Sequence, residues 1–201
     1  MRRLQVATML WAVLLLPACQ RDPGRDVEPM TDPLHRPESA SAPQDVIPID
    51  EVRKSQAAAV SQRIANTEVT ITYSRPVARG RELFGALVPH EQVWNPGADQ
   101  ATVVAFTRDV HVNEQPLAAG KYSIWAIPRP RVWTVIFSNA ADVYHTPYPG
   151  EAHDALRLDV ESEAGPHMEA LMFYFPVVEG KDARLQLHWG SLVVPLSIRV
   201  P

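Results

Sequence analysis

The sequence predicts an all-β fold for residues 52–201, a single β-sandwich of about nine to ten short strands. Three features of this part of the chain predict it. Apolar and polar residues alternate with a period of two over short runs, and turn-forming residues separate most of these runs. No stretch shows the 3.6-residue period of a long amphipathic helix, so we expect the strands to build the whole core.

The first predicted element is a β-hairpin. Residues 69–73 alternate between apolar and polar side chains, and Val60, Gln62 and Ile64 share the same period of two with only Gln62 polar; the short segment Asn66-Thr67 separates the two runs. A short helix over residues 58–64, capped by Asp50, is the alternative. The β-branched residues and the tight spacing between the two runs favour strands.

Further strands are recognised by β-branched and aromatic residues between turn formers. They are expected at residues 102–107, 110–113, 121–127, 132–138, 156–161, 168–177, 183–189 and 192–200. The turns between them are expected at Asn113-Glu114-Gln115-Pro116, Ala119-Gly120, Pro128-Arg129-Pro130, Gly165-Pro166 and Glu179-Gly180. This pattern fits a sandwich of either jelly-roll or immunoglobulin-like topology.

The first 18 residues have the features of a secretory signal peptide. Arg2 and Arg3 precede an apolar run, residues 4–16, which is too short to span a bilayer as a stable helix. The run ends in Leu16-Pro17-Ala18-Cys19, which resembles a lipobox, so we expect Cys19 to be lipidated and to become the mature N-terminus. An ordinary signal peptide with a chance cysteine is the alternative. No second cysteine exists to pair with Cys19 in a disulfide bond.

Residues 19–50 are predicted to form a disordered tether between Cys19 and the β domain. The segment is polar, has no hydrophobic period and contains six prolines, and it cannot bury enough apolar surface to offset its ordering entropy. Because Gln20 follows the cysteine, and not an Asp that would favour the inner membrane, we expect the anchor on the periplasmic face of the outer membrane. A Gram-positive cell surface is the alternative.

The charge of the mature chain argues against a nucleic-acid partner. Without residues 1–18 the chain has 17 basic and 23 acidic side chains, a net charge of −6. Nucleic-acid binding requires a basic surface that neutralises phosphates. The expected partners are therefore the membrane, through lipidated Cys19, and an envelope protein or glycan.

Several motifs occur in order along the predicted domain. They are Tyr73-Ser74-Arg75-Pro76, Gly80-Arg81-Glu82-Leu83-Phe84-Gly85, Leu87-Val88-Pro89, Val93-Trp94 with Gly97-Ala98, Ala119-Gly120-Lys121-Tyr122-Ser123 and Trp133-Thr134-Val135-Ile136-Phe137. Their order and spacing resemble the bacterial domain-of-unknown-function family numbered 2911, whose members often follow lipoprotein signals. The resemblance covers the chain from about Ser55 to the C-terminus and implies no established activity.

The chain departs from the family pattern directly after Trp94. There the family commonly has an arginine, a short residue, glycine, alanine, asparagine and glutamate, whereas this chain has Asn95-Pro96-Gly97-Ala98-Asp99-Gln100. Amides replace a guanidinium and a carboxylate, and a carboxylate replaces an amide. Any chemistry of this loop in relatives is therefore expected to be altered or lost here.

The segment between Arg75 and Gln100 is the leading candidate for ligand binding, since it is the longest stretch without strand periodicity. Arg75 and Arg81 offer guanidinium groups for a carboxylate, phosphate or sugar hydroxyl, Asp99 and Gln100 offer polar contacts, and Trp94 offers a stacking surface. The alternative is structural: the arginines pair with Asp99 or bond loop carbonyls, and Trp94 plugs an open end of the sandwich.

Two aromatic residues of predicted strands, Tyr122 and Trp125, are further ligand-binding candidates. Trp125 shares its strand face with Lys121 and Ser123, and an exposed tryptophan on an outer face suits carbohydrate stacking. The alternative is that this second face of the sheet is also covered.

The segment 142–154 contains the weak metal-ligand candidates His145, His153 and Asp154. It lacks the helical spacing of His-Glu-x-x-His, and solvated loop residues are the commoner explanation, so neither a metal nor another cofactor is expected. No nucleophile motif is present. The sequence thus favours a non-enzymatic binding domain, with an envelope hydrolase or metal-dependent enzyme, acting through residues 75–100 or 142–154, as the alternative.

Overall fold

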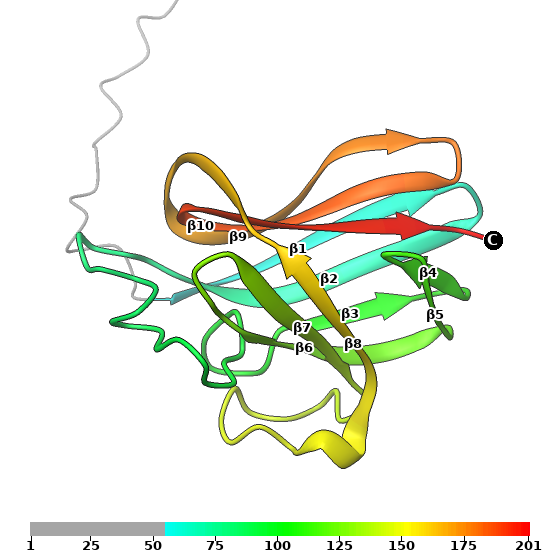
Figure 1. Cartoon of the computed structure of the whole chain (residues 1–201). Helices are drawn as coiled ribbons and strands as arrows, with labels where there is room; N and C mark the ends of the chain where they lie inside the picture. The colour runs from blue at the N-terminus through cyan, green and yellow to red at the C-terminus, as the bar shows by residue number, and fades with distance from the viewer. Residues whose placement is uncertain (1–54) are drawn as a thin grey trace, which may run out of the picture. The chain divides into compact units, whose positions relative to one another are not determined.

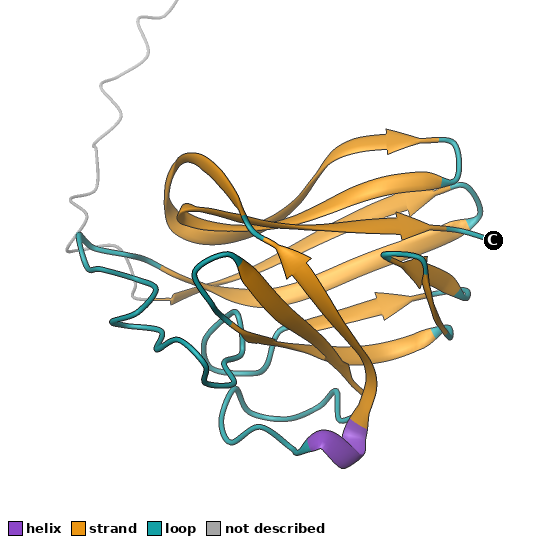
Figure 2. Ribbon diagram, in the orientation of Figure 1, coloured by secondary structure: helices purple, strands orange, loops and turns teal. Residues whose placement is uncertain are grey.

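The computed structural model describes residues 55–201, which form two antiparallel sheets (Figures 1 and 2). The expected signal peptide (1–18), Cys19 and the tether (19–50) lie outside the described residues. The strands are β1 (Ser55–Ile64), β2 (Thr67–Pro76), β3 (Val103–Phe106), β4 (Val110–Val112), β5 (Gln115–Leu117), β6 (Gly120–Ile127), β7 (Val132–Ser138), β8 (Asp154–Glu161), β9 (Glu163–Glu179) and β10 (Asp182–Arg199), with a short 3-10 helix, η1 (Glu151–His153), before β8.

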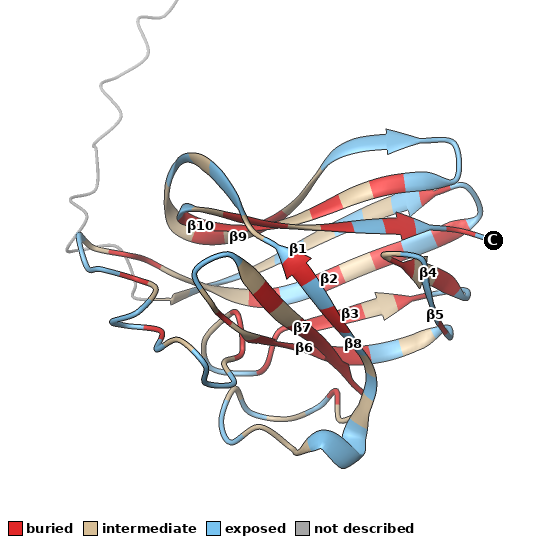
Figure 3. Cartoon of the chain, viewed as in Figure 1, coloured by how far each residue is buried: buried red, intermediate tan, exposed pale blue. Residues whose placement is uncertain are grey.

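The two sheets confirm the predicted β-sandwich. One sheet has six strands in the order β1-β2-β3-β6-β7-β8, and the other has four in the order β5-β4-β10-β9. Inward-facing apolar side chains of both sheets form the main core, as the buried bands along the strands in Figure 3 show. Within residues 55–201, no helix has the length and apolarity needed to cross a bilayer.

The predicted first hairpin is confirmed in the structure. β1 and β2 pair in regular antiparallel register from Ser55 opposite Pro76 to Ile64 opposite Thr67. Ile64, Val69 and Ile71 are buried, which matches the alternation in the sequence. The strand β2 continues three residues beyond the predicted end at Tyr73.

The turn predicted at residues 113–116 is shorter than expected. Only Asn113 and Glu114 form it, and both have positive φ, 45° and 67°, as a two-residue hairpin turn requires. Gln115 and Pro116 belong to β5, which pairs with β4. Because β5 is an edge strand, Pro116 deprives no neighbouring strand of a hydrogen bond.

Two glycines lie inside long strands and not between shorter ones. Gly165, a predicted turn residue, is within β9, and Gly190, which lies between the strands predicted at residues 183–189 and 192–200, is within the single strand β10. The β9–β10 pairing shifts register on either side of Gly190, which adopts a φ of 57°. A bulge of this kind bends a strand without ending it, and sequence alternation alone cannot distinguish it from a turn.

Replacing Gly190 by Ala is expected to destabilise the fold more than replacing Gly180 by Ala. Both glycines have left-handed φ, 57° and 58°, so both substitutions introduce similar backbone strain, about 1–2 kcal/mol. A Cβ at Gly190 would lie 2.8 Å from Cδ1 of the buried Leu83, whereas nothing lies within 4 Å of a Cβ at Gly180. Urea denaturation of the full-length chain should show a further loss of about 1–3 kcal/mol in the free energy of unfolding for Gly190→Ala. Equal losses in the two variants would contradict the tight contact.

Candidate functional site

The connection from β2 to β3, residues 77–102, is not a free loop. Its second half completes the edge of β6 where β3 has ended. Trp94 exchanges two main-chain hydrogen bonds of 2.8 Å with Ala126, and the N–H of Ile124 donates to the carbonyl of Thr102 over 2.8 Å. The N–H of Glu91 donates to the carbonyl of Pro128 over 3.0 Å. The loop therefore behaves as an additional strand segment of the six-stranded sheet.

A buried amide fixes the segment from Trp94 to Thr102. The side-chain N–H of Asn95 donates to the carbonyl of Ile124 over 2.7 Å, and its Oδ1 accepts the main-chain N–H of Thr102 over 3.1 Å. The hydroxyl of Thr102 donates to the carbonyl of Pro96 over 2.7 Å. Asn95 and Thr102 are both fully buried, so these bonds satisfy groups that water does not reach.

The first half of the same connection is attached to β9. The N–H of Ala78 donates to the carbonyl of Glu169 over 2.8 Å, and the N–H of Arg79 donates to the Glu169 carboxylate over 2.5 Å. A hydrogen bond from His167, followed by the one from the Arg79 main chain, lowers the pKa of Glu169 below its usual value. Residues 77–79 are thus fixed to one sheet, and residues 91–102 to the other.

Two aromatic residues of the connection fill the space between the sheets at this end. Phe84 meets Trp133 of β7 edge to face, with ring centroids 4.8 Å apart, and also contacts Trp94 and Trp189. Trp94 lies nearly parallel to Trp189 of β10, at 6.0 Å and 14°. This packing agrees with the structural alternative for Trp94, in which it plugs an open end of the sandwich. One side of Trp94 nevertheless remains accessible.

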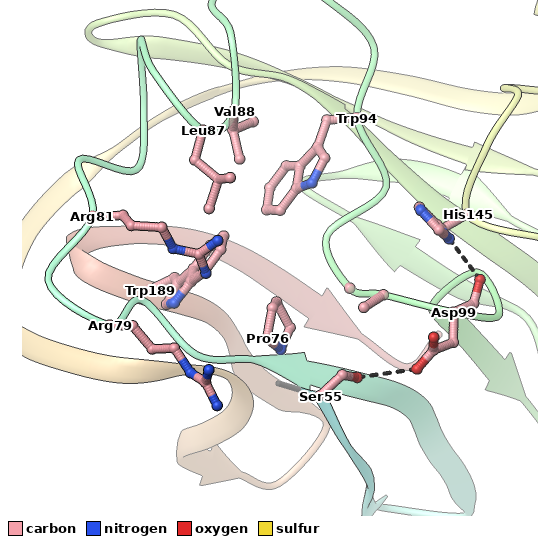
Figure 4. A pocket seen from close by; sticks show the side chains of 12 residues that line it. Ser55, Pro76, Arg79, Arg81, Leu87, Val88, Trp94, Asp99, His145 and Trp189 are labelled. Carbon is pink, nitrogen blue, oxygen red and sulfur yellow. Dashed lines mark hydrogen bonds between the residues drawn. The ribbon is translucent and has the colours of Figure 1, made fainter. Parts of the chain in front are cut away.

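The accessible side of Trp94 lines a pocket of about 570 Å³ (Figure 4). This volume is within the range of small-molecule sites, about 300–1,000 Å³. The connection 77–102 supplies most of the wall, β10 supplies Trp189, the start of β1 supplies Ser55, and the loop before η1 supplies His145. The lining residues are Ser55, Pro76, Arg79, Arg81, Leu87, Val88, Trp94, Gly97, Ala98, Asp99, His145 and Trp189.

Arg81 lies on one side of this pocket, with Arg79 beside it (Figure 4). The Nε of Arg81 donates to the carbonyl of Ala78 over 2.8 Å, and its Nη2 donates to the carbonyl of Val77 over 2.6 Å. Bonding to loop carbonyls is the structural role we had considered for this residue. No carboxylate within residues 55–201 lies at ion-pair distance from Arg81.

Asp99 lies on the other side of the pocket, together with Ser55 and His145. Its carboxylate accepts a hydrogen bond from the Ser55 hydroxyl over 3.2 Å. Its carbonyl accepts the main-chain N–H of His145 over 3.0 Å and bonds Nδ1 of the same ring over 2.7 Å. A carbonyl can only accept, so Nδ1 of His145 carries the proton, and Nε2 is left as an acceptor when the ring is neutral.

Arg75 and Gln100 are not among the residues that line the pocket. Arg75 lies in β2, and its Nε donates to the carbonyl of Leu171 in β9 over 3.1 Å. The hydroxyl of Tyr73 accepts the main-chain N–H of Phe173 over 3.1 Å. These two side chains join the sheets along the edge of β9. Gln100 forms a backbone bridge with Tyr144 and lines a separate, shallow depression over β1 and β2.

Tyr122 and Trp125 are buried, which corrects the expectation of an exposed aromatic surface. Tyr122 is 5% exposed in the main core, and its hydroxyl donates to the carbonyl of Ala118. Trp125 is on the outer face of β6, as the alternation of side chains along the strand predicts, but it is only 1% exposed. Val143 and Tyr148 of the following loop pack over it in a second small apolar cluster. The loop thus covers the outer face of the sheet.

The three weak metal-ligand candidates lie in different elements: His145 is in the loop after β7, His153 ends η1 and Asp154 begins β8. The Asp154 side chain is 9% exposed, accepts the hydroxyl of Tyr148 and accepts Nε of Arg157 over 2.6 Å. Burial of Tyr148 and its hydrogen bond to Asp154 raise the pKa of the Tyr148 hydroxyl to about 12. His153 ends η1 and is exposed, and His145 faces Asp99. In the described part of the chain, no three His, Cys, Asp or Glu side chains are grouped closely enough to hold a metal ion.

The comparison with protein families agrees with the motifs in the sequence. The model of the family described as "Protein of unknown function (DUF2911)" matches residues 55–198, from the start of β1 almost to the end of β10. The chain belongs to this family. Neither curated proteins nor solved structures give a match.

Three residues that follow Trp94 in this DUF2911 member have different roles. Asn95 is a buried structural amide, Asp99 faces the pocket, and Gln100 lies outside it. Sequence reasoning predicted Arg81, Trp94 and Asp99, all of which line the pocket. It considered His145 only as a weak metal ligand, and it did not select Leu87 or Trp189, because an apolar loop residue and a tryptophan in a distant core strand give no ligand-binding signal in sequence.

Proposed function

We propose that this protein is a lipid-anchored receptor of the bacterial cell envelope, which binds a small ligand in the pocket beside Trp94 and catalyses no reaction. The main support for this proposal is the pocket itself. It combines an aromatic and aliphatic floor with a few charged groups at its sides, on a rigid scaffold. Ligand sites generally have this composition.

The attachment of the pocket wall to both sheets supports binding over catalysis. A preorganised wall reduces the entropy lost when a ligand is ordered. The candidate acid–base groups of the pocket, Asp99 and His145, interact through the Asp99 carbonyl, and the Ser55 hydroxyl donates to the Asp99 carboxylate and not to the His145 ring. An envelope hydrolase or metal-dependent enzyme is the alternative, and it predicts turnover of a bound compound.

The proposed anchor is the lipidated Cys19 at the N-terminal side of the β domain. Two or more acyl chains on Cys19 would attach the protein stably to a membrane. The proposed place of attachment is the periplasmic face of the outer membrane. Ser55, at the start of β1, lines the pocket.

A Cys19→Ser variant of the full-length chain is expected to lose membrane attachment. Cells making the wild-type protein should incorporate labelled palmitate into it and keep it in the membrane fraction. The variant should incorporate none and should be released by washing. A variant that stays in the membrane fraction to the same extent as the wild type would overturn the proposed anchor.

The binding proposal predicts that truncating Leu87 weakens the ligand without unfolding the protein. Leu87 lines the pocket and is 41% exposed, whereas Val177 is 46% exposed and lies outside it. Full-length protein in mild detergent would be titrated with peptidoglycan fragments, neutral oligosaccharides and short peptides. We expect Leu87→Ala to weaken binding by about three- to tenfold, through lost apolar contact, and Val177→Ala to leave it unchanged.

Trp94→Phe provides a second variant that preserves most of the aromatic packing. The change in intrinsic fluorescence on ligand binding should differ from that of the wild type. The midpoint of urea unfolding should stay close to the wild-type value. Failure of every ligand class to bind, or binding that neither pocket variant changes, would refute the binding function. Turnover of any titrated compound would favour the enzymatic alternative.

A further inference from the structure

The charged groups of the pocket are segregated by sign. Arg79 and Arg81 lie together on one side, while Asp99, Ser55 and His145 lie together on the other (Figure 4). Trp94 lies between the two groups in this view. A ligand that satisfies both sides must therefore carry a negative group at one end, a positive group at the other and an apolar body between them.

We propose that the pocket binds a short zwitterionic peptide, about three residues long, with its carboxylate at Arg81 and its ammonium group at Asp99. This assignment rests on the proposed binding function and names the ligand class for the same site. The guanidinium group of Arg81, the acceptors around Asp99 and the size of the pocket each support one part of such a peptide.

Arg81 presents a fixed end of its guanidinium group to the pocket. Nε and Nη2, which form one side of the group, are already bonded to the carbonyls of Ala78 and Val77. Of the five N–H donors of an arginine, three remain, and they include the parallel pair on Nη1 and Nη2 that matches a carboxylate. Because the two carbonyl bonds fix the plane of the group, little side-chain entropy is lost on binding.

The charge of Arg81 is only partly offset within the protein. The Arg81 charge contributes to the lowered pKa of Glu169, which places the two groups near each other. Glu169 nevertheless lies beyond ion-pair distance from Arg81 and is already bonded to His167 and to the main chain of Arg79. A ligand carboxylate would therefore be the first direct ionic partner of Arg81 in the described structure.

The side chains of Asp99 and His145 offer hydrogen-bond acceptors on the other side of the pocket. The Asp99 carboxylate holds one hydrogen bond, from Ser55, and makes no ion pair within residues 55–201. Since Nδ1 of His145 donates to the Asp99 carbonyl, Nε2 of a neutral His145 is an acceptor. An ammonium group has three donors and no acceptor, which matches this side, whereas a second anion would be repelled by it.

The size of the pocket sets the length of the ligand. A compact space of 570 Å³ is about 10 Å across, and an extended chain covers at most about 3.3–3.6 Å per residue, so about three residues fit. Leu87, Val88 and Trp94 offer apolar surface to the central side chain. A neutral glycan could stack on Trp94 but would leave both charged sides without a partner, so the chemistry favours a peptide.

The test compares three forms of one tripeptide, Ala-Leu-Ala, by calorimetric titration of the full-length protein in mild detergent. One form has both free ends, one is N-acetylated and one is C-amidated. We expect the wild type to bind the form with free ends about tenfold more tightly than either blocked form, since each blocked end loses one charge-assisted contact.

Two variants assign the ends of the peptide to the two sides of the pocket. Asp99→Asn should abolish the preference for the free ammonium group and keep the preference for the free carboxylate. Arg81→Gln should do the reverse, while its amide can still donate to a loop carbonyl. The matched controls, Arg131→Gln and Glu161→Gln, change exposed charges outside the pocket and should keep both preferences.

The outcomes separate this inference from the proposed function. Equal binding of all three forms, or preferences that survive in both variants, would overturn the zwitterion assignment. If only a neutral oligosaccharide or a peptidoglycan glycan binds, with the expected loss in Leu87→Ala, the binding function stands and the peptide assignment falls. If nothing binds, both fall.

Discussion

The structure of the site depends on one constraint, the unequal lengths of β3 and β6. The strand β3 pairs with β6 only as far as Ser123, yet β6 continues to Ile127. The groups on the exposed edge beyond Ser123 require hydrogen-bond partners, because unpaired backbone groups in a protein interior are costly. Main-chain groups of Glu91, Trp94 and Thr102, together with the side chain of Asn95, supply them.

This pairing determines where the side chains of the connection lie. With its main chain fixed on β6, Trp94 is directed between the sheets, where it meets Phe84 and Trp189. The next residues turn back at Gly97, where a Cβ would lie 2.5 Å from the hydroxyl of Thr102. Asp99 follows with positive φ, 61°, at the side of the pocket opposite Arg81. The pocket is thus a consequence of how the sheet edge is completed.

The sequence predicted the features that depend on local periodicity and turn chemistry. The β1–β2 hairpin follows from alternation over residues 60–64 and 69–73, and the sandwich follows from the number of such runs. The motif residues Arg81, Trp94 and Asp99 were recognised as a group because they share one non-periodic segment. Features set by register were missed. The bulge at Gly190 resembles a turn in sequence, and Pro116 in β5 resembles a turn residue.

Side-chain bonds to distant backbone were also beyond sequence reasoning. Nothing near Arg75 indicates that it donates to Leu171, and nothing near Asn95 indicates that it bonds Ile124. Trp125 illustrates a related limit. The alternation of side chains along the strand correctly predicts that it lies on the outer face of β6. Whether a loop covers that face depends on the path of residues 139–150, which this alternation does not encode.

Hydrogen exchange of the main-chain amides of the full-length chain tests this account most directly. If residues 91–102 complete the edge of β6, the amides of Trp94 and Thr102 should exchange within about tenfold of the rate of Val104 in the core strand β3. The exposed Gln92 in the same connection serves as the internal reference for a freely exchanging amide. Exchange of Trp94 and Thr102 at the rate of Gln92 would contradict the account, since the pocket wall would then be a mobile loop.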